Sequence, residues 1–435
     1  MMCVKSVEII PSPLKGNVKI PPSKSLSHRA IICAGLSEGE SHIENIAFSD
    51  DIIATLEAMK SFGIIARNSE IDIDGICSVY IKGKGKLELL RNQIDCKESG
   101  STIRFLIPMA GLLGEKVTYT GRGKLVERPL DAYYKIFEEQ DIAYYNHEGK
   151  LPLSVEGILK PGIFNMKGNV SSQFITGLLF VLPILHKDSK IIITTELESK
   201  GYVDLTLDIL KKFSIYVENN NYKEFYIKGN QKYKPTEYRV EGDFSQAAFF
   251  IVAGILGDEV VCKDLNVASL QADKAILDIA KKMGAKLCVS DDFIKVEKSN
   301  TKGIIIDVSQ CPDLVPILSV LGALSKGTTK IVNAARVRIK ESDRLKAMAT
   351  ELNKLGADVK ELTDGLEIHG KEQLNGGIVD SWNDHRIAMA LAIASIKCTG
   401  PVIIKNSDAV KKSYPRFWKD FEKLGGKINE RYMGK

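Results

Sequence analysis

The feature that most constrains this chain is a unit of about 70 residues that occurs six times. Each copy contains an apolar segment, rich in small residues, that follows a polar start. The starts are separated by 74, 72, 74, 66 and 72 residues and lie at Ser25, Ser99, Ser171, Ser245, Cys311 and Asn383. Segments of this length and composition predict helices that are apolar on every side and therefore buried. A repeat at a fixed period indicates one supersecondary unit used six times.

A second, amphipathic helix alternates with the buried helix. Its apolar residues recur at i, i+3 or i+4 and i+7, which predicts one buried face. Such helices are expected over Asp51–Met59, Asp204–Lys212 and Asp273–Met283, and from near Asp131, Asp343 and Ser413. Runs typical of β-strands, such as Lys116–Tyr119, follow several of the buried helices. The unit is therefore strand, buried helix, strand, amphipathic helix and further strands.

Six such units exceed what a single hydrophobic core usually holds, so the 435 residues predict two domains of three units each. One boundary is expected near the polar segment Gly229–Pro235, and a second crossing near Leu14–Ile20. The expected domains are residues 20–233, and residues 1–19 together with 234–435. We expect sheets to cover the buried helices, and the active site to lie in the cleft between the domains.

The composition is that of a soluble globular protein, with 44% apolar and 26% charged residues. A net charge of +5 suits small anionic substrates better than nucleic acid. The eight cysteines, Cys3 among them, form no C-x-x-C pair, which argues against structural zinc and disulfides. The N-terminus lacks the apolar region of a signal peptide, and runs such as Phe174–Leu185 are too short to span a bilayer. We therefore expect a cytoplasmic protein.

The polar starts of the buried helices carry the candidate chemistry. Helix N-termini bear partial positive charge and unpaired N–H groups, which attract anions. The groups concerned are Lys24/Ser25/Arg29, Ser99/Gly100/Ser101/Arg104, Ser171/Ser172/Gln173, Asp243/Ser245/Gln246, Asp307/Cys311/Asp313 and Asp384/His385/Arg386. If the helices of each domain run parallel, these starts converge at one end. The alternative for each serine by itself is helix capping.

The guanidinium fork of arginine matches carboxylate and phosphate oxygens, so Arg128 and Arg344 are further candidates. Lys412, which is also a cation, is a third candidate. The alternative for Lys340–Arg344 is a solvated helix start capped by Ser342 or Asp343. The chain has no G-x-x-x-x-G-K-[ST], G-x-G-x-x-G, H-E-x-x-H or G-x-S-x-G motif. We therefore expect no cofactor and no metal.

Taken together, the motifs resemble the enolpyruvyl transferases, and within them the branch that acts on shikimate 3-phosphate. The resemblance covers essentially the whole chain. The motifs are PPSKSLSHR at 21–29, SGSTIR at 99–104, ERPLD at 127–131, SSQ at 171–173, GDFSQA at 242–247, DVSQCPD at 307–313, RIKESDRL at 338–345, NDHRIAMA at 383–390 and KKSYP at 411–415. It implies an α/β (α+β) fold of two domains, each built of three βαβαββ units around buried parallel helices. This is the inside-out α/β barrel shared with the RNA 3′-phosphate cyclases.

Three other functions stay open. The UDP-N-acetylglucosamine enolpyruvyl transferases carry a reactive cysteine in the loop before their Arg-Pro, whereas Gly121–Pro129 contains none. The RNA 3′-phosphate cyclases use a nucleotidylated histidine, and nothing singles out such a histidine here. The third alternative is an anion-binding protein without catalysis, which would not need Asp307, Glu341 and the arginines together.

The resemblance implies that the 5-hydroxyl of shikimate 3-phosphate adds to C2 of phosphoenolpyruvate, and that phosphate then leaves. This reaction belongs to the shikimate pathway, which supplies chorismate and the aromatic amino acids. By similarity Asp307 is the base, Glu341 protonates C3, and Lys24 lies between both substrates. Such positioned acids and bases typically give on the order of 10²–10⁴-fold each.

The resemblance also implies two binding sites and a chain that acts as a monomer. The phosphoenolpyruvate site would comprise Lys24, Gly100, Arg128, Gln173, Arg344, Arg386 and Lys412. The shikimate 3-phosphate site would comprise Lys24, Ser25, Arg29, Ser171, Ser172, Gln173, Ser199, Asp307 and Lys340. Gly100 lacks a side chain, as in family members that bind glyphosate, so we expect sensitivity to that inhibitor. Glu98 and Arg336 stand where many members have asparagine.

Overall fold

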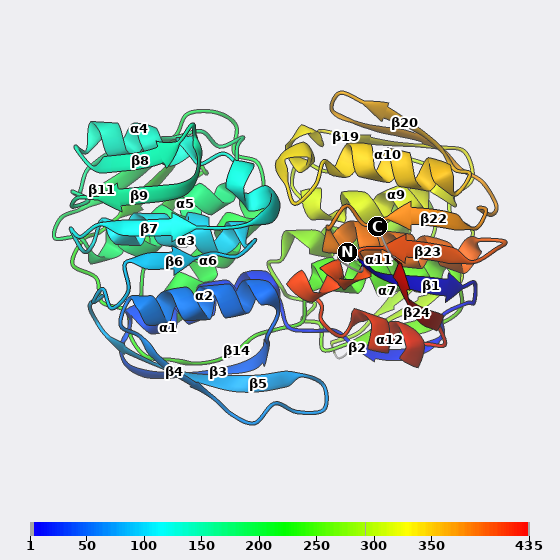
Figure 1. Ribbon diagram of the computed structural model, residues 1–435, viewed down its shortest axis with the longest axis horizontal. Helices are drawn as coiled ribbons and strands as arrows, with labels where there is room; N and C mark the ends of the chain where they lie inside the picture. Colours follow the sequence, from blue (N-terminus) through cyan, green and yellow to red (C-terminus); the bar gives the residue numbers. More distant parts are fainter. Residues whose placement is uncertain (1–3, 292, 434–435) are drawn as a thin grey trace. The chain divides into compact units, whose positions relative to one another are not determined.

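The computed structural model describes residues 4–291 and 293–433, and the chain divides into two compact units (Figure 1). Unit 1 comprises residues 1–21 and 241–435, and unit 2 comprises residues 22–240. The second boundary lies later than the expected one at 233/234. The reason is that β14 (Glu237–Arg239) pairs in parallel with β3 (Glu38–Ala47), and the Asn45 amide donates to the Val240 carbonyl at 2.6 Å. Residues 234–240 therefore belong to unit 2.

Among the described residues, each unit contains three four-stranded sheets of one design. The first two strands are parallel, and the third strand pairs antiparallel with both the second and the fourth. In unit 2 the orders are β14-β3-β5-β4, β6-β7-β9-β8 and β10-β11-β13-β12. The strands not yet given are β4 (Ile65–Asn68), β5 (Ile76–Lys84), β6 (Gln93–Asp95), β7 (Val117–Thr120), β8 (Ala143–His147), β9 (Lys150–Glu156), β10 (Ile163–Met166), β11 (Ser189–Ile193), β12 (Val217–Asn220) and β13 (Glu224–Ile227).

Unit 1 repeats the design in the orders β2-β15-β17-β16, β18-β19-β21-β20 and β22-β23-β1-β24. Its strands are β1 (Val4–Ile10), β2 (Gly16–Lys19), β15 (Val260–Lys263), β16 (Lys286–Val289), β17 (Phe293–Glu297), β18 (Ile305–Asp307), β19 (Thr328–Val332), β20 (Asp358–Leu362), β21 (Gly365–His369), β22 (Gly377–Asp380), β23 (Val402–Lys405) and β24 (Lys427–Met433). Strand β1 lies between β23 and β24, so the beginning of the chain completes the last sheet.

In two sheets, the first strand does not come directly before the rest of that sheet in the chain. Strand β2 precedes the first helix of unit 2 but pairs with β15 of unit 1, with Val18 opposite Cys262. Strand β14 precedes the first helix that follows residue 241 but pairs with β3 of unit 2, with Tyr238 opposite Ile43. Each crossing of the chain thus leaves one strand in the sheet of the unit it came from.

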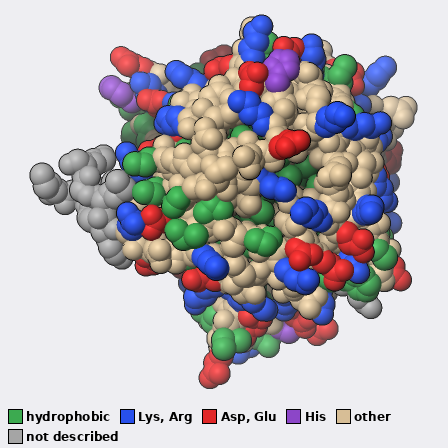
Figure 2. All heavy atoms as spheres, turned by 90° about the vertical axis from the view of Figure 1, so that its right-hand side faces the viewer, with side chains coloured by type: hydrophobic (Ala, Val, Ile, Leu, Met, Phe, Trp, Pro, Cys, Tyr) green, Lys and Arg blue, Asp and Glu red, His purple; other side chains and the backbone are tan. Residues whose placement is uncertain are grey.

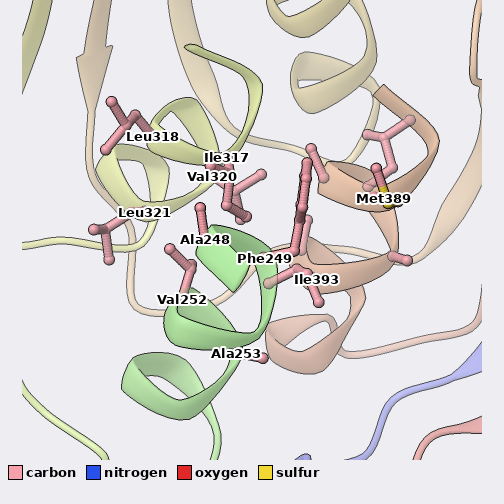
Figure 3. Close-up of a cluster of buried hydrophobic side chains, with 14 of the residues drawn as sticks. Ala248, Phe249, Val252, Ala253, Ile317, Leu318, Val320, Leu321, Met389 and Ile393 are labelled. Atoms are coloured by element: carbon pink, nitrogen blue, oxygen red, sulfur yellow. The ribbon is translucent and has the colours of Figure 1, made fainter. Parts of the chain in front are cut away.

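The helix that precedes the second strand of each sheet is buried along almost its whole length. These helices are α1 (Lys24–Leu36), α3 (Gly100–Ala110) and α5 (Ser172–Val181) in unit 2, and α7 (Phe244–Leu256), α9 (Val315–Ala323) and α11 (His385–Ala394) in unit 1. Figure 3 shows side chains of α7, α9 and α11 in contact, with Phe249, Val320 and Met389 among them. The buried helices predicted from the apolar composition are thus confirmed, and so is the mixed α/β fold.

In each of the six 70-residue repeats, the second helix packs one face inward. These helices are α2 (Asp50–Ser61), α4 (Asp131–Glu139), α6 (Lys200–Lys212), α8 (Ala275–Met283), α10 (Arg344–Lys354) and α12 (Phe417–Lys423). Helix α6 begins at Lys200, before the expected Asp204, because the chain already turns at Ser199. Helix α12 begins at Phe417 and not near Ser413, because Ser407–Lys412 forms a 3₁₀ helix, η7, ahead of it.

Nothing in the described part of the chain indicates a membrane span: its helices are too short or too polar to cross one. The seven cysteines that the structure describes are free thiols, and Cys3 lies outside the described residues. On the face seen in Figure 2, Lys and Arg side chains are interspersed with Asp and Glu, so that face carries no broad patch of one sign.

Candidate active site

In unit 2, serines cap all three buried helices. Ser23 Oγ accepts from the Leu26 N–H at 3.5 Å, Ser99 Oγ from the Thr102 N–H at 3.2 Å, and Ser171 Oγ from the Gln173 N–H at 3.3 Å. Ser25 is the second residue of α1 and not its cap. Capping satisfies one N–H group at each helix start and leaves the partial positive charge of the terminus in place.

Side-chain contacts link these three helices at or near their starts. Gln173 at the start of α5 accepts from Arg104 Nη1 at 2.9 Å and donates to Ser101 Oγ at 2.8 Å, and both partners belong to α3. A chain of short contacts joins α1 to α3 through α2: His28 Nδ1 to Thr55 Oγ1, and Thr55 Oγ1 to Thr102 Oγ1, each at 2.7 Å. The starts of α3 and α5 are therefore adjacent in unit 2, and α1 is linked to α3 through side chains that lie about one turn further along α1 and α2.

Lys24, the first residue of α1, is held by a carboxylate. Its Nζ lies 2.6 Å from Asp51 Oδ2, and the two side chains are 15% and 10% exposed. Asp51 belongs to the first turn of α2, where the sequence interpretation treated it only as part of a helix start. Because the pair is largely withdrawn from water, it fixes the direction of the Lys24 ammonium more firmly than a surface pair would.

Arg29 is buried and is held by neutral groups. Its Nε donates to Thr206 Oγ1 at 2.9 Å, Nη1 to the Ser25 carbonyl at 2.7 Å, and Nη2 to the Tyr202 carbonyl at 3.1 Å. Burial lowers the pKa of Arg29 to about 10, so it stays protonated at neutral pH. The guanidinium thus keeps its positive charge, with N–H donors remaining out of the five that arginine has.

Gly100 is the first residue of α3 and lies close to the Arg128 guanidinium. A Cβ built on Gly100 would lie 2.7 Å from Arg128 Nη1 and 2.9 Å from its Cζ, closer than side chains approach each other. Arg128 itself is 5% exposed and follows the 3₁₀ helix η1 (Gly123–Glu127). The absence of a side chain at Gly100 therefore leaves room for the guanidinium to lie close to the helix start.

The other predicted residues of unit 2 lie at helix starts as well. Ser172 is buried at the beginning of α5, directly after the cap Ser171. Ser199 is buried and precedes α6 in a left-handed backbone conformation, with φ of +57°.

In unit 1, one half-buried carboxylate holds three cations. Asp313 Oδ1 lies 2.8 Å from Arg344 Nη1 and 3.5 Å from Lys340 Nζ, and its Oδ2 lies 3.1 Å from Arg386 Nη2. Burial by itself would raise the pKa of Asp313, but the charges of Arg386, Lys340 and Arg344 outweigh it and hold that pKa well below its usual range. Asp313 precedes α9 and Arg386 lies in the first turn of α11, so these two helix starts are adjacent.

Arg344 has two further carboxylate partners. Its Nε donates to Asp384 Oδ2 at 2.9 Å, and its Nη2 donates to Glu341 Oε2 at 2.7 Å. The Arg344 side chain is 1% exposed and that of Asp384 is fully buried. Burial opposes the charge of Arg344, but Asp384, Glu341 and Asp313 together raise its pKa. Glu341, the predicted proton donor, is thus fixed by an arginine predicted to bind phosphoenolpyruvate.

Lys412 lies beside the start of α11, and Asp307 lies at the end of a strand of unit 1. Lys412, the last residue of η7, donates from Nζ to the Asn383 carbonyl at 2.6 Å, one residue before the α11 cap Asp384. Asp307 ends β18 with an exposed side chain. Its Oδ1 accepts from the Ser309 N–H and its Oδ2 from Asn333 Nδ2, both at 2.8 Å.

The predicted residues fall into two groups, one in each unit. Unit 2 holds Lys24, Ser25, Arg29, Gly100, Arg128, Ser171, Ser172, Gln173 and Ser199, and unit 1 holds Asp307, Lys340, Glu341, Arg344, Arg386 and Lys412. Sequence reasoning chose the cations and named Asp313 and Asp384 among the polar helix starts, but it did not identify these two residues and Asp51 as the carboxylates that hold the cations. Each of the three stands in or beside the first turn of a helix, and that position was the available signal.

Comparison with known proteins adds a family. The family model of EPSP synthase (3-phosphoshikimate 1-carboxyvinyltransferase) matches residues 9–421. A Clostridium novyi (strain NT) protein named 3-phosphoshikimate 1-carboxyvinyltransferase is 65% identical over 442 residues, covering 99% of this chain and 100% of its own length. A Clostridium acetobutylicum protein of the same name is 60% identical over 435 residues, covering 100% of both chains.

A solved structure agrees with these sequences. The structure of EPSP synthase from Acinetobacter baumannii matches with a TM-score of 0.82 at 26% identity, covering 98% of this chain and 100% of that one. Sequence and fold thus point to the same relatives over nearly the whole chain.

Proposed function

Because the chain belongs to the family of EPSP synthases (3-phosphoshikimate 1-carboxyvinyltransferases), we propose that it transfers the carboxyvinyl group of phosphoenolpyruvate to the 5-hydroxyl of shikimate 3-phosphate. The products are 5-enolpyruvylshikimate 3-phosphate and inorganic phosphate. This family was the one that the sequence motifs resembled, and that expectation is confirmed.

The proposed reaction has two steps. The 5-hydroxyl adds to C2 of phosphoenolpyruvate while C3 receives a proton, which gives a tetrahedral intermediate. C3 then loses a proton as the C2–O bond to phosphate breaks, and the double bond forms again. Proton transfer and ion pairing suffice for both steps, so the proposal includes no metal and no cofactor.

We assign the proton transfers to two carboxylates of unit 1. Asp307 accepts the proton of the 5-hydroxyl. Partial burial opposes ionisation of Asp307, but hydrogen bonds from Ser309 and Asn333 lower its pKa, so it is a carboxylate at neutral pH. Glu341, in its carboxylic acid form, delivers the proton to C3, and Lys24 of unit 2 lies between the substrates. Positioned groups of this kind contribute on the order of 10²–10⁴-fold.

The observation that carries the proposal is the arginine pair of unit 1. Arg344 and Arg386 share the half-buried Asp313, and Arg344 also contacts Glu341 at 2.7 Å. A guanidinium pair held in this way suits the carboxylate and phosphate of phosphoenolpyruvate, and it keeps the proton donor beside them. In unit 2 we assign Arg128 and Gly100 to the same substrate, and Ser25, Arg29, Ser171 and Ser172 to shikimate 3-phosphate.

Four further residues complete the proposed sites. We assign Gln173 to both substrates and Lys412 to phosphoenolpyruvate. Shikimate 3-phosphate would also contact Ser199 and Lys340. Because the two groups belong to different units, we propose that the units enclose both substrates in a cleft between them. Small-angle scattering with and without both substrates tests this idea, and unchanged dimensions would contradict it. A monomer in the cytoplasm remains our expectation, and light scattering during gel filtration tests the oligomeric state.

The function is tested by phosphate release. The chain is incubated with phosphoenolpyruvate and shikimate 3-phosphate together, with each alone, and with UDP-N-acetylglucosamine as the acceptor. We expect release only when phosphoenolpyruvate and shikimate 3-phosphate are both present. Release with the UDP-sugar and none with shikimate 3-phosphate would overturn the proposal.

A further inference from the structure

Asp307 and Asn333 are neighbours because of the sheet that carries them. Strands β18 and β19 are parallel, with Asp307 opposite Val332, so their carboxyl ends meet at one edge of the sheet. Asp307 is the last residue of β18, and Asn333 follows the last residue of β19. The backbone therefore brings the Asn333 side chain beside the Asp307 carboxylate.

Both oxygens of the Asp307 carboxylate receive hydrogen bonds from the protein. The Ser309 N–H donates to Oδ1 and Asn333 Nδ2 donates to Oδ2, both at 2.8 Å, and the Ser309 side chain also hydrogen-bonds to the carboxylate. A carboxylate has about four acceptor positions, so it can still accept a bond from a substrate. The two contacts at separate oxygens fix the plane of the carboxylate, which one contact alone would not do.

The turn that carries Asn333 is itself suited to asparagine. The φ of Asn333 is +58°, a left-handed conformation that asparagine tolerates better than most residues. From the same turn, Arg336 Nη2 donates to the Ser309 carbonyl at 2.6 Å and so holds the segment whose N–H contacts Asp307. One turn thus supports the Asp307 carboxylate directly and through Ser309.

The same arrangement recurs in the neighbouring sheet of unit 1. Asp380 ends β22, its Oδ1 accepts from the Trp382 N–H at 2.7 Å, and Asn406 Nδ2 donates to its two oxygens at 3.1 and 3.2 Å. Asn406 follows β23 with φ of +55°. Asp380 and Asn406 are half-buried, whereas Asp307 and Asn333 are exposed. The arrangement is a feature of the repeat, and in β18–β19 it lies open to a substrate.

We propose that Asn333 is a positioning residue for the Asp307 carboxylate in the carboxyvinyl transfer. Asn333 fixes the orientation of this base and favours its ionised form, so that an acceptor oxygen is ready when the 5-hydroxyl arrives. The inference deepens the proposed function and rests on it. Other titratable or charged groups near Asp307 are the Cys311 thiol, whose pKa burial raises to about 12, and the Arg336 guanidinium. Neither changes its charge near neutral pH.

The test is the pH profile of kcat/KM in four proteins: the parent, Asn333→Gly, Asn333→Asp and Asn406→Gly. Asn333→Gly removes the donor and keeps the left-handed turn. We expect its kcat to fall about 10-fold and its acidic limb to move up by roughly one pH unit, because a hydrogen bond to a charged group is lost. Asn333→Asp places a second carboxylate beside the first and should move the limb further. The substrates titrate identically in every protein, so a difference between variants belongs to the enzyme.

Asn406→Gly is the matched control, since it removes the same contact from the sister turn. We expect its acidic limb to coincide with that of the parent, whatever its stability. An unmoved limb in both Asn333 variants, or an equal movement in Asn406→Gly, would overturn the inference. Failure of the proposed function looks different, because the parent would then release no phosphate at all.

Discussion

The two units place arginines at or near the starts of helices, but they hold these arginines differently. In unit 2, Arg29 is held by the Thr206 hydroxyl and two carbonyls, and Arg104 by the Gln173 amide. In unit 1, carboxylates surround Arg344, with Asp313, Asp384 and Glu341 all within 3 Å of its nitrogens.

The difference matters for what each unit can bind. Neutral acceptors leave the charge of an arginine uncompensated, so it acts at full strength on a phosphate ligand. Carboxylates compensate the charge but fix the guanidinium planes and keep a proton donor within reach. We therefore expect unit 2 to contribute mainly binding, and unit 1 to contribute both binding and proton transfer.

The largest expected effect comes from breaking the buried ion pair of unit 1. Asp384→Asn leaves Arg344 with one fewer charge partner, and loss of one member of a buried pair typically costs about 3–5 kcal/mol. Thr206→Val is the matched change in unit 2 and should cost only about 1–3 kcal/mol, because a neutral acceptor is lost. Urea unfolding of both variants measures the two costs. An equal or larger loss in Thr206→Val would contradict the comparison.

The next effect separates chemistry from charge balance within unit 1. Glu341→Gln should lower kcat by roughly 10²-fold or more if Glu341 donates the proton. Phosphoenolpyruvate binding should change little, because Arg344 keeps Asp313 and Asp384. Glu361→Gln is the control, since Glu361 is an exposed partner of Arg338. Steady-state phosphate release measures both variants, and near-normal turnover in Glu341→Gln would remove it from the mechanism.

A smaller effect is expected at the helix start beneath Arg128. In Gly100→Ala the new methyl group must displace the guanidinium, since Nη1 lies 2.7 Å from the Cβ position. We expect KM for phosphoenolpyruvate to rise about 10-fold, in line with a lost bond between charged groups, with KM for shikimate 3-phosphate less affected. Gly162→Ala is the control, because only Gln140 Nε2 comes within 4 Å of its Cβ position. Equal KM values in Gly100→Ala and the parent would rule out this role for Arg128.

The smallest effect is a pH dependence of unit 2. Burial, with the nearby charges of Lys24 and Arg29, lowers the pKa of His28 well below its ordinary value. The unfolded chain therefore takes up a proton near pH 6.5, where the folded chain does not. The free energy of unfolding should be highest above about pH 6.5 and should decline as the pH falls, by at most about 1.4 kcal/mol per pH unit.

Urea unfolding at several pH values checks this dependence. His28→Gln should flatten the curve below pH 6.5, whereas His186→Gln, at an exposed histidine of the same unit, should leave it unchanged. The same slope in the parent and in His28→Gln would show that His28 does not cause it.

Much of the fold follows from local sequence. The buried helices could be predicted because their apolar residues face every direction, and their spacing revealed the six units. The exchange of β2 and β14 could not be predicted, because strand pairing over more than 190 residues leaves no local pattern. The start of α12 was also predicted too early, because η7 interrupts the chain first.

The candidate site was predicted unevenly for a related reason. Lys24 and Arg386 could be proposed because charged residues at the start of apolar helices are unusual, and Arg344 because the arginine fork matches carboxylate and phosphate oxygens. Asp51 could not be distinguished from an ordinary acidic first turn until the structure paired it with Lys24. Asn333 follows a strand in a turn, and its contact with Asp307 depends on parallel pairing between strands that are distant in the sequence.

The central claim is that the chain joins two substrates and does not merely hydrolyse phosphoenolpyruvate. Proton NMR of a reaction containing phosphoenolpyruvate and shikimate 3-phosphate distinguishes the two outcomes. We predict new vinyl resonances of a carboxyvinyl ether on the shikimate ring, formed in amounts equal to the phosphate released. Phosphate accompanied by pyruvate, with no vinyl ether, would contradict the account.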